Sequence, residues 1–302
     1  RTRDVKAKLQ RLVDTGETTF EVAKMAQGDD PAFMVVKTLT LEYTIGGQHK
    51  TAMGIDPDTI TLSLPPDAPE LIAELRCDAK GKPLFEAWQP GQYEFKTASG
   101  KSQTMEVASL PAPLTLEGPW EVQFPLHWGA PEYARFKKLI SWSDHPDEGI
   151  KHFSGTATYT KTFEIPAGFL GDNHRLYLDL GKVQIMAQVK LNGKELGTLW
   201  KPPFRIDITD SAKTGENALE IKVVNLWVNR MIGDEFLPED SSRNPDGTLK
   251  EWPQWLNENK HSPTGRFTFT TWRLWKKDAP LQPSGLIGPV MLRATEVFGS
   301  WE

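Results

Sequence analysis

The chain is 302 residues long, a quarter of its residues are charged, and its formal net charge is −5. This length can bury a sizeable core and predicts two or three domains. The acidic balance provides no basic surface for nucleic acid or anionic lipid, and no apolar run approaches the roughly 20 residues that span a bilayer. We therefore expect neither nucleic acid nor a membrane as a partner. The single cysteine, Cys77, excludes an internal disulfide framework.

The first 66 residues predict a small β-rich module with one short helix. Residues 1–16 predict the helix, because apolar side chains recur at helical spacing on one face: Val5, Leu9, Leu12 and Val13. Residues 18–25 and 35–45 predict strands, and Gly46-Gly47 predicts a hairpin turn into a further strand at 49–53. Alternation at 60–64 then closes the module before Pro65-Pro66.

Residues 67–112 predict a β-hairpin followed by a linker. Strands are expected at 92–97 and 102–107, on either side of a turn that contains Ser99-Gly100. The stretch 109–113, Ser-Leu-Pro-Ala-Pro, is too rich in proline for regular structure. We therefore place the main domain boundary in this stretch.

Residues 113–302 predict a β-sandwich. Residues 156–163 alternate threonines with other side chains, and leucines alternate over 176–180, as in a strand with two unlike faces. Asn192-Gly193, between two apolar-rich runs, is the strongest short signal for a hairpin. A second turn at 214–217 precedes an alternating strand at 218–223. Several short strands separated by turns indicate a sandwich or barrel rather than a helical or βαβ fold.

The regular alternation of apolar and polar residues ends after Asn229. Residues 233–261 combine acids, prolines and glycine with few apolar residues, and predict a long loop. A loop of this length inside a compact domain is usually functional or mobile. We expect regular structure to return at 265–274 and the chain to close on a last strand at 285–292.

Five segments of this third unit carry a resemblance to a known family. They include GPWEVQF and NLWVNRMIGDE, and they occur in the expected order at 118–124, 141–163, 178–209, 225–235 and 269–293. The set resembles the C-terminal sugar-binding β-sandwich of family 106 glycoside hydrolases, the α-L-rhamnosidases. It is more distantly similar to the jelly-roll sugar-binding domain of family 2 glycosidases. The resemblance implies a mostly β chain, with a galactose-binding-like jelly roll at 113–302 and a smaller β-rich module at its N-terminus.

The resemblance also carries a departure that bears on function. The enzymes of this family mount their two catalytic carboxylates on a large barrel domain, and nothing in this chain resembles that barrel. No series of alternating strands and helices is present. The resemblance therefore implies an ancillary portion of a glycosidase and not the hydrolytic domain.

The first module shows a separate resemblance. The segments RDVKAKLQRLVD and KTLTLEYTIGGQHKTAM are similar to the C-terminal domain of a mitochondrial DnaJ-type co-chaperone. That domain has no catalytic motif. For residues 1–66 the resemblance implies an accessory fold and no chemistry.

Acidic residues could still supply the carboxylate pair that glycoside hydrolysis needs. Candidates gather in two clusters: Asp144, Asp147 and Glu148, and then Asp234, Glu235, Glu239 and Asp240. The commoner role of such clusters is that of solvated loop residues, so we assign no catalytic residue. His127, His145 and His152 lie close together in the sequence, but their spacing matches no zinc signature.

A structural calcium ion is a candidate cofactor, because jelly-roll sugar-binding domains often hold one through loop oxygens. One inter-strand loop offers suitable ligands: Asp207, Asp210, Glu216 and Asn217. Capping of turns by Asp and Asn is the alternative explanation of these residues. We expect no other cofactor.

Aromatic residues point to carbohydrate contact, because aromatic rings stack on the apolar faces of sugars. Ten of the eleven tryptophans lie at or after Trp120, although tryptophan also fills sandwich cores. The candidates for carbohydrate contact are Trp142, Trp200, Trp227, Arg230, Trp272 and Trp275. Arg230 and Asp234, four residues apart, could instead form an ion pair at the base of the long loop.

We therefore expect a non-catalytic, carbohydrate-associated C-terminal portion of an α-L-rhamnosidase-like glycoside hydrolase, which binds sugar or positions the catalytic domain. Because the chain begins with Arg1 rather than Met, we expect a piece of a longer protein. Its partners would be a carbohydrate, such as a rhamnose-containing glycan, and a catalytic domain in the same parent chain. Two alternatives stay open: a purely structural sandwich that braces an absent barrel, and a glycosidase active by itself. The resemblance implies a periplasmic or secreted bacterial protein that acts in polysaccharide degradation.

Overall fold

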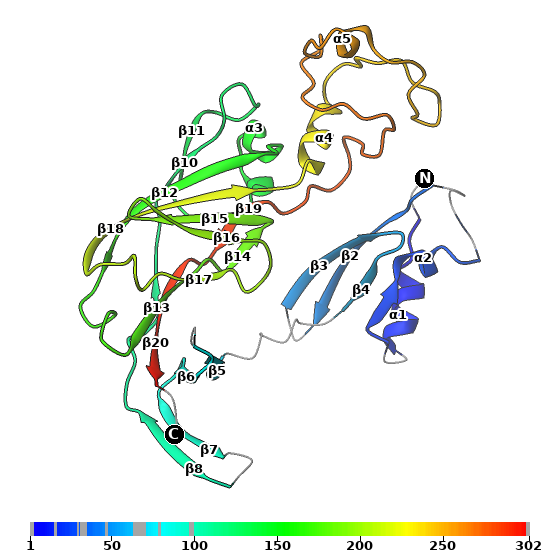
Figure 1. Ribbon diagram of the computed structural model, residues 1–302. Coiled ribbons are helices and arrows are strands. Elements are labelled where there is room, and N and C mark those ends of the chain that lie inside the picture. Colours follow the sequence, from blue (N-terminus) through cyan, green and yellow to red (C-terminus); the bar gives the residue numbers. More distant parts are fainter. Residues whose placement is uncertain are drawn as a thin grey trace. The chain divides into compact units, whose positions relative to one another are not determined.

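The computed structural model describes residues 3–14, 17–28, 30, 35–45, 48–62, 71–77, 80–96 and 100–299. The chain divides into two compact units, residues 1–71 and 72–302 (Figure 1). Strands dominate both units, which confirms the predicted mostly β fold class. None of the described helices has the length and apolar character that a membrane span requires.

The first unit packs two helices and two small sheets around a core that has seven buried side chains among the described residues. The core comprises Leu9, Phe20, Val22, Met25, Leu39, Ile60 and Leu62. The elements in chain order are α1 (Lys6–Asp14), β1 (Thr19–Glu21), α2 (Val22–Met25), β2 (Thr38–Ile45), β3 (Gln48–Ile55) and β4 (Thr59–Thr61). Both sheets are antiparallel, one from β1 and β4 and the other from β2 and β3.

The predicted N-terminal helix is confirmed, and one predicted strand of the first unit is wrong in its second half. The strand expected at 18–25 ends at Glu21 and continues as the short helix α2. Val22 and Met25 are three residues apart, so a helical turn brings both into the core, as a strand would not. The predicted end of the helix at residue 16, the Gly46-Gly47 turn and the Pro65-Pro66 break lie outside the described residues.

The second unit is built on two antiparallel sheets. The first, called the β12 sheet, has the order β11 (Tyr133–Phe136), β10 (Trp120–Gln123), β12 (Thr156–Ile165), β18 (Gly215–Val224), β15 (Met186–Leu191) and β16 (Lys194–Leu199). The second, called the β13 sheet, has the order β17 (Arg205–Asp207), β13 (His174–Asp179), β20 (Met291–Phe298), β6 (Pro83–Ala87) and β5 (Ala73–Cys77), with β9 (Leu114–Thr115) beside β20.

One hydrophobic core lies between the two sheets. Alternate residues of β12, including Ala157 and Tyr159, contribute to it from one side, and Leu176 and Leu178 of β13 contribute from the other. The predicted alternation therefore has its physical cause in this core, because successive strand residues face opposite sides of a sheet. Each fully buried leucine contributes about 1.5–3 kcal/mol relative to an exposed one.

The Asn192-Gly193 hairpin between β15 and β16 is confirmed. Asn192 has φ 50° and Gly193 has φ 84°, the positive values that a tight two-residue hairpin turn uses. The side chain of Asn192 also holds the neighbouring strand, because its Oδ1 accepts a hydrogen bond of 3.0 Å from the backbone N–H of Ala218. The turn thereby sets the position of β15 against β18.

The principal division of the chain lies between residues 71 and 72 rather than at the proline-rich stretch 109–113. The reason is that β6 pairs with β20, so residues before the proline-rich stretch belong to the β13 sheet. The predicted hairpin is confirmed as β7 (Gly91–Lys96) and β8 (Ser102–Val107), although Ser99 lies outside the described residues. Its side chains share a small core with β6 and β20: Phe85, Ala87, Met105 and Val107, with Phe298 packed against them.

A buried carboxylate links β6 to the rest of the β13 sheet. Glu86 is almost fully buried; its Oε2 accepts a hydrogen bond of 3.1 Å from the Tyr177 hydroxyl, and its Oε1 accepts one of 2.6 Å from the Thr295 hydroxyl. The Nε of Arg76 lies 3.3 Å from Oε2 and balances the charge. Burial, reinforced by Glu86, raises the pKa of Tyr177. This network fixes the β5–β6 pair to the sandwich.

The remaining elements lie at one end of the sandwich. They are the 3-10 turn η1 (Trp142–Asp144), α3 (Glu148–Lys151), β14 (Lys182–Gln184), α4 (Val228–Asp234), α5 (Gln254–Asn257) and β19 (Gly285–Gly288), which pairs with β14. Residues 235–283, called the extension, leave the sandwich at α4 and return to it at β19 (Figure 1).

The extension confirms the predicted long loop. The predictions for the segments that follow this loop need correction. Regular structure does not return at 265–274, where the structure has no strand. The strand expected at 285–292 is divided into β19 and β20, because Pro289 between them has no N–H to donate to a sheet. The sequence did not indicate α4, whose few apolar residues interrupt a polar run.

Candidate functional site

A buried ion pair holds the base of the extension. Arg230 and Asp234 lie one turn apart on α4, are 6% and 1% exposed, and are joined by a hydrogen bond of 3.0 Å from Nε to Oδ1. The predicted ion pair is therefore present. The second carboxylate oxygen of Asp234 accepts three hydrogen bonds, at 2.7–2.9 Å, from the backbone N–H groups of Phe267 and Thr268 and from the Thr268 hydroxyl. One carboxylate thus joins the start of the extension to its returning segment.

Gly233 leaves the space in which the Arg230 guanidinium group approaches Asp234. A Cβ atom on Gly233 would lie 2.4 Å from Nη2 of Arg230 and 2.7 Å from Cβ of His152. Any other residue at this position would push the guanidinium group away from Asp234. The sequence Arg-Met-Ile-Gly-Asp therefore combines the ion pair with the space that the pair needs.

A second group of ion pairs holds the extension together above its base. Arg266 contacts Glu235 at 2.9 Å and Glu239 at 3.0 Å, and it also donates hydrogen bonds to the carbonyl groups of Leu237 and Pro238. Arg273 contacts the same two carboxylates, Glu235 at 3.1 Å. We call these four residues, with Arg230 and Asp234, the ion-pair network. Charge-assisted contacts of this kind replace the apolar core that the extension lacks.

Five of the seven acidic residues weighed as catalytic candidates have structural partners. Asp234, Glu235 and Glu239 belong to the ion-pair network. Asp147 caps α3 by accepting a hydrogen bond of 3.0 Å from the N–H of Ile150, and Glu148 pairs with Lys151 at 3.1 Å. These contacts account for five of the seven candidates through capping and ion pairing, whereas Oδ2 of Asp240 is buried without a hydrogen-bond partner among the described residues.

Three aromatic rings meet where the extension joins the sandwich. Trp128 lies edge-on to both Trp227 and Phe267, with 6.0 Å between ring centroids in each pair. Its indole N–H donates a hydrogen bond of 2.7 Å to the carbonyl of Ser154, and the Arg230 guanidinium lies over the Phe267 ring at 4.8 Å. Trp227 is 49% exposed, so this junction presents an aromatic face to solvent on a fixed base.

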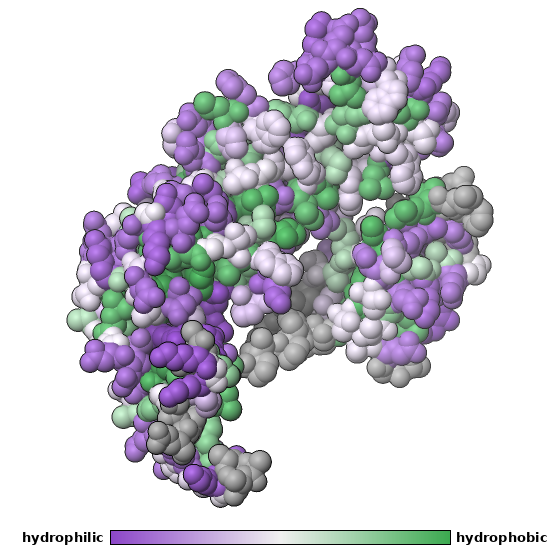
Figure 2. All heavy atoms as spheres, in the orientation of Figure 1, coloured by the Kyte–Doolittle hydropathy of each residue, from purple (hydrophilic) through white to green (hydrophobic). Residues whose placement is uncertain are grey.

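A second aromatic group lies further along the extension. Phe269 packs against Trp252 and Trp255, with centroid distances of 5.7 and 5.8 Å. The Trp255 indole donates to the carbonyl of Asp240 at 2.8 Å, which leaves Trp252 as the exposed ring, at 58%. Trp272 is 45% exposed and donates to the carbonyl of Asp246. In Figure 2, green and white residues are exposed among purple ones at the end of the molecule where Figure 1 draws the extension.

Four of the six predicted contact residues lie on the extension or at its base. Trp227 and Arg230 lie at the base of the extension, and Trp272 and Trp275 lie on its returning segment. Trp275 is half-buried beside a small cavity lined by Arg243 and Arg273. Arg230 is committed to Asp234, so its role is to position the extension. Trp200 is 67% exposed after β16, where its ring contacts Lys201.

The prediction for Trp142 is corrected by its burial. Its side chain has no exposed surface, packs against Phe124 and Phe153, and donates its indole N–H to the hydroxyl of Tyr159. A ring without exposed surface cannot stack on a sugar. Trp142 turned inward because it begins η1, which closes the end of the sandwich over the core.

Sequence reasoning missed the exposed Trp252 and the supporting Trp128. Trp252 lies in Glu-Trp-Pro-Gln-Trp, inside a stretch that is otherwise poor in apolar residues. Such an aromatic residue in a polar loop has no core to enter, and that contrast was an available signal. Trp128 had no comparable signal, because its role depends on packing against two rings far away in the sequence.

The predicted calcium ligands have local partners in the structure. Asp207 accepts hydrogen bonds from the backbone N–H and the hydroxyl of Thr209, and the buried Asn217 binds Lys213, Gly215 and Asn192. Turn capping is thus present at both residues. Across the described part of the chain, no three His, Cys, Asp or Glu residues are grouped to hold a metal ion. Calcium at Asp207, Asp210, Glu216 and Asn217 stays a prediction.

Comparisons with known proteins match this architecture. Residues 147–245 match the model of the family 2 glycosyl hydrolase galactose-binding domain-like family. A curated protein of Formosa agariphila, named “Putative beta-glucuronidase”, is 40% identical over 295 residues, which cover 96% of this chain and 24% of that protein. The structure of a rhamnosidase from Novosphingobium sp. PP1Y aligns with a TM-score of 0.50 and 24% identity, and covers 96% of this chain and 26% of the rhamnosidase.

These matches define a class of domain. The second unit contains a galactose-binding-like β-sandwich associated with glycoside hydrolases, and the chain spans about a quarter of the length of the curated relative. The likeness to the rhamnosidase structure concerns the fold. Because the match to the Formosa protein covers 96% of the chain, it extends through most of the first unit. The first unit is therefore shared with this relative.

Proposed function

We propose that this chain is a non-catalytic, carbohydrate-associated portion of an α-L-rhamnosidase-like glycoside hydrolase, and that its extension contacts the glycan. One observation carries the proposal: exposed tryptophan rings stand on an extension that an ion-pair network holds against a galactose-binding-like sandwich. Trp227, Trp252 and Trp272 provide the stacking faces. Polar and charged groups of the same extension surround them, which suits the apolar faces and hydroxyl edges of sugars.

The choice of an α-L-rhamnosidase-like parent, of family 106, rests on the ordered sequence segments. The fold likeness to the Novosphingobium rhamnosidase is consistent with this parent, whereas the name of the Formosa relative favours a β-glucuronidase. A catalytic domain in the same parent chain is part of the proposal, as are a periplasmic or secreted location in a bacterium and a role in polysaccharide degradation. The first unit is an accessory module in this proposal, with the DnaJ-type resemblance describing only its shape.

Titration calorimetry tests the carbohydrate claim. We expect rhamnose-containing oligosaccharides to release heat on binding to the chain. The double variant Trp252→Ala/Trp272→Ala should weaken binding roughly tenfold or more, because each aromatic contact contributes about 0.5–1.5 kcal/mol beyond its buried area. Trp200→Ala tests the remaining predicted contact residue separately, since it removes an exposed ring outside the extension. Absence of heat with every glycan would sink the claim.

A bracing role is the second candidate, favoured by exposed apolar side chains beside the aromatic faces. Leu226, Phe236 and Leu274 are each at least half exposed around the base and the return of the extension. Exposed apolar surface of this kind marks sites of protein contact. If the separately produced catalytic domain protects the backbone amides of these residues from hydrogen exchange, and no glycan does, the bracing role replaces the sugar-binding one.

The calcium prediction has its own test. After treatment with a chelator, addition of Ca²⁺ should raise the melting temperature, because an ion that binds only the folded chain stabilises it. The variant Asp210→Asn/Glu216→Gln should abolish the rise. An unchanged melting temperature in the native chain assigns these residues to turn capping alone.

A further inference from the structure

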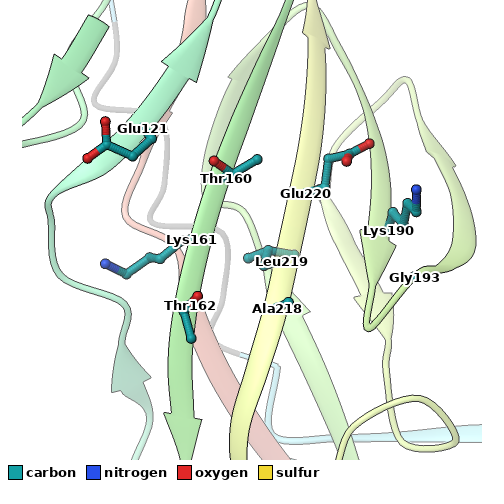
Figure 3. Close-up of a pocket in the computed structure, with 9 residues that line it drawn as sticks. All are labelled: Glu121, Thr160, Lys161, Thr162, Lys190, Gly193, Ala218, Leu219 and Glu220. Carbon is teal, nitrogen blue, oxygen red and sulfur yellow. The ribbon is translucent and has the colours of Figure 1, made fainter. Parts of the chain in front are cut away.

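A shallow hollow lies on the outer face of the β12 sheet, away from the aromatic residues of the extension. Its volume is about 410 Å³, and strands β10, β12, β18 and β15 contribute its lining (Figure 3). Its lining includes Glu121, Thr160, Thr162, Lys190, Ala218 and Glu220.

The register of the strands explains the hollow. One row of directly paired residues crosses four strands in the order Glu121, Thr160, Glu220, Lys190. In the next row, Thr162 is paired with Ala218, close to Gly193 of the neighbouring turn. Small side chains therefore occupy the middle of the sheet face, while the longer Glu121, Glu220 and Lys190 stand around them. A depression with an apolar floor and a polar rim results.

The polar groups of the hollow are available to a ligand. Among the described residues, the side chains of Thr160, Thr162 and Lys190 make no hydrogen bond or ion pair. Glu121 and Glu220 each have an exposed cationic neighbour, Arg135 at 3.1 Å and Lys222 at 3.9 Å. Exposed pairs of this kind contribute about 0–1 kcal/mol, so a ligand can replace them at little cost.

The charges select the class of ligand. Two carboxylates, Glu121 and Glu220, are balanced by two lysines, and one of these, Lys161, donates to the carbonyl of Pro119 and lies over the Trp120 ring. The lining contains no arginine and no large aromatic ring. A phosphate or uronate group would meet two carboxylates, and the Arg135 guanidinium beside the hollow already pairs with Glu121. A flat apolar ligand would find no stacking face in the lining. Hydroxyl groups can both donate and accept, which matches threonine, glutamate and lysine together.

We propose that this hollow is a second binding site, for a neutral glycan segment that lies across strands β12 and β18. Its apolar floor, formed by Ala218 and the threonine methyl groups, faces the C–H side of a sugar ring. The rim of Thr160, Glu121, Glu220 and Lys190 binds the ring hydroxyls. That the ligand is a glycan rests on the proposed function. The place where it binds is inferred from the hollow alone.

Methyl-detected NMR tests the site directly. A neutral rhamnose-containing tetrasaccharide should shift the methyl signals of Ala218, Thr160 and Thr162. The variant Thr160→Val/Thr162→Val keeps the shape and the strand preference but removes two hydroxyls, and should weaken this response roughly tenfold, since a neutral hydrogen bond contributes about 0.5–1.5 kcal/mol. Thr156→Val, outward-facing on the same strand but outside the hollow, is the matched control and should change nothing.

The two sites separate cleanly in this experiment. If the methyl signals of the hollow stay fixed while the indole signals of Trp252 and Trp272 respond, the second site is wrong and the proposed function stands. If the hollow responds and the indoles do not, the second site stands and the role of the extension fails. If neither the methyl signals of the hollow nor the indole signals of the extension change, both proposals are contradicted. A response of the hollow to an oligogalacturonide alone, without any response to the neutral tetrasaccharide, contradicts the neutral class.

Discussion

The sandwich and the extension belong to one compact unit but are held by different physics. The sandwich buries a continuous apolar core, in which Trp142, Tyr159 and Leu178 have no exposed surface. The extension buries few apolar residues and depends on the ion-pair network around Asp234 and Glu235. The sandwich should therefore be sensitive to substitutions that remove side-chain volume from its core. The extension should be sensitive to substitutions that remove a charge. Exposed aromatic rings can therefore stand on the extension without a core beneath them.

The largest expected effect comes from truncating the core of the sandwich. Trp142→Ala should lower the free energy of unfolding by about 3–5 kcal/mol, because it opens a cavity and leaves the Tyr159 hydroxyl without its indole donor. Urea unfolding followed by circular dichroism measures the loss. Trp200→Ala, at a 67% exposed position, should change the free energy by less than about 0.5 kcal/mol. Equal losses in the two variants would show that the sandwich does not depend on this core residue.

Removing the buried charge of the extension should rank second. Asp234→Asn leaves the buried Arg230 without its counter-charge and weakens the three hydrogen bonds to Phe267 and Thr268. Breaking one partner of a buried ion pair costs about 3–5 kcal/mol, and we expect the low end of this range because Asn keeps one oxygen that accepts hydrogen bonds. Native-state hydrogen exchange should show that loss as faster exchange of the Phe267 and Thr268 amides, while the amides of β12 keep their protection. Glu258→Gln, on the exposed surface of α5, serves as the control. Uniform deprotection of both regions would contradict the separation of the two.

A partly exposed member of the same network should matter less. Glu239 is 49% exposed and contacts Arg266 and Arg273. Glu239→Gln should lower the local stability of the extension by about 0.5–1 kcal/mol, and the difference from the native chain should shrink at high salt, because salt screens exposed charges. Hydrogen exchange at two salt concentrations measures both quantities. An effect that does not depend on salt would mean that Glu239 acts through packing and not through charge.

The sequence predicted the sandwich better than the extension. The sandwich shows itself in patterns of neighbouring residues, whereas the extension depends on contacts between residues far apart in the sequence. The Asn192-Gly193 turn and the alternation in β12 are local, so they were predictable from neighbouring residues alone. Trp142 and Trp272 look alike in the sequence, but only the packing of η1 over the core buries the first. The ion pair of Arg266 with Glu235 joins residues 31 apart, and no local pattern encodes it. Arg230 and Asp234 were predictable as a pair, because they lie four residues apart in the sequence.

The smallest expected effect is a pH dependence that arises at the contact between α3 and α4. His152 is almost fully buried, and burial lowers its pKa below the ordinary 6.5; the neighbouring Arg230 and Lys151 lower it further, while Glu148 opposes them. Above pH 6.5 the ring is neutral in both states and this contribution to stability is complete. As the pH falls below 6.5, the unfolded chain takes up a proton before the folded chain does, so stability declines until the folded pKa is passed. His152→Gln should flatten this decline in urea unfolding measured between neutral and acidic pH, whereas His261→Gln, at an exposed position, should keep it. If the decline persists in the His152 variant, the acid sensitivity belongs to other groups, and the junction of the extension with the sandwich does not sense pH.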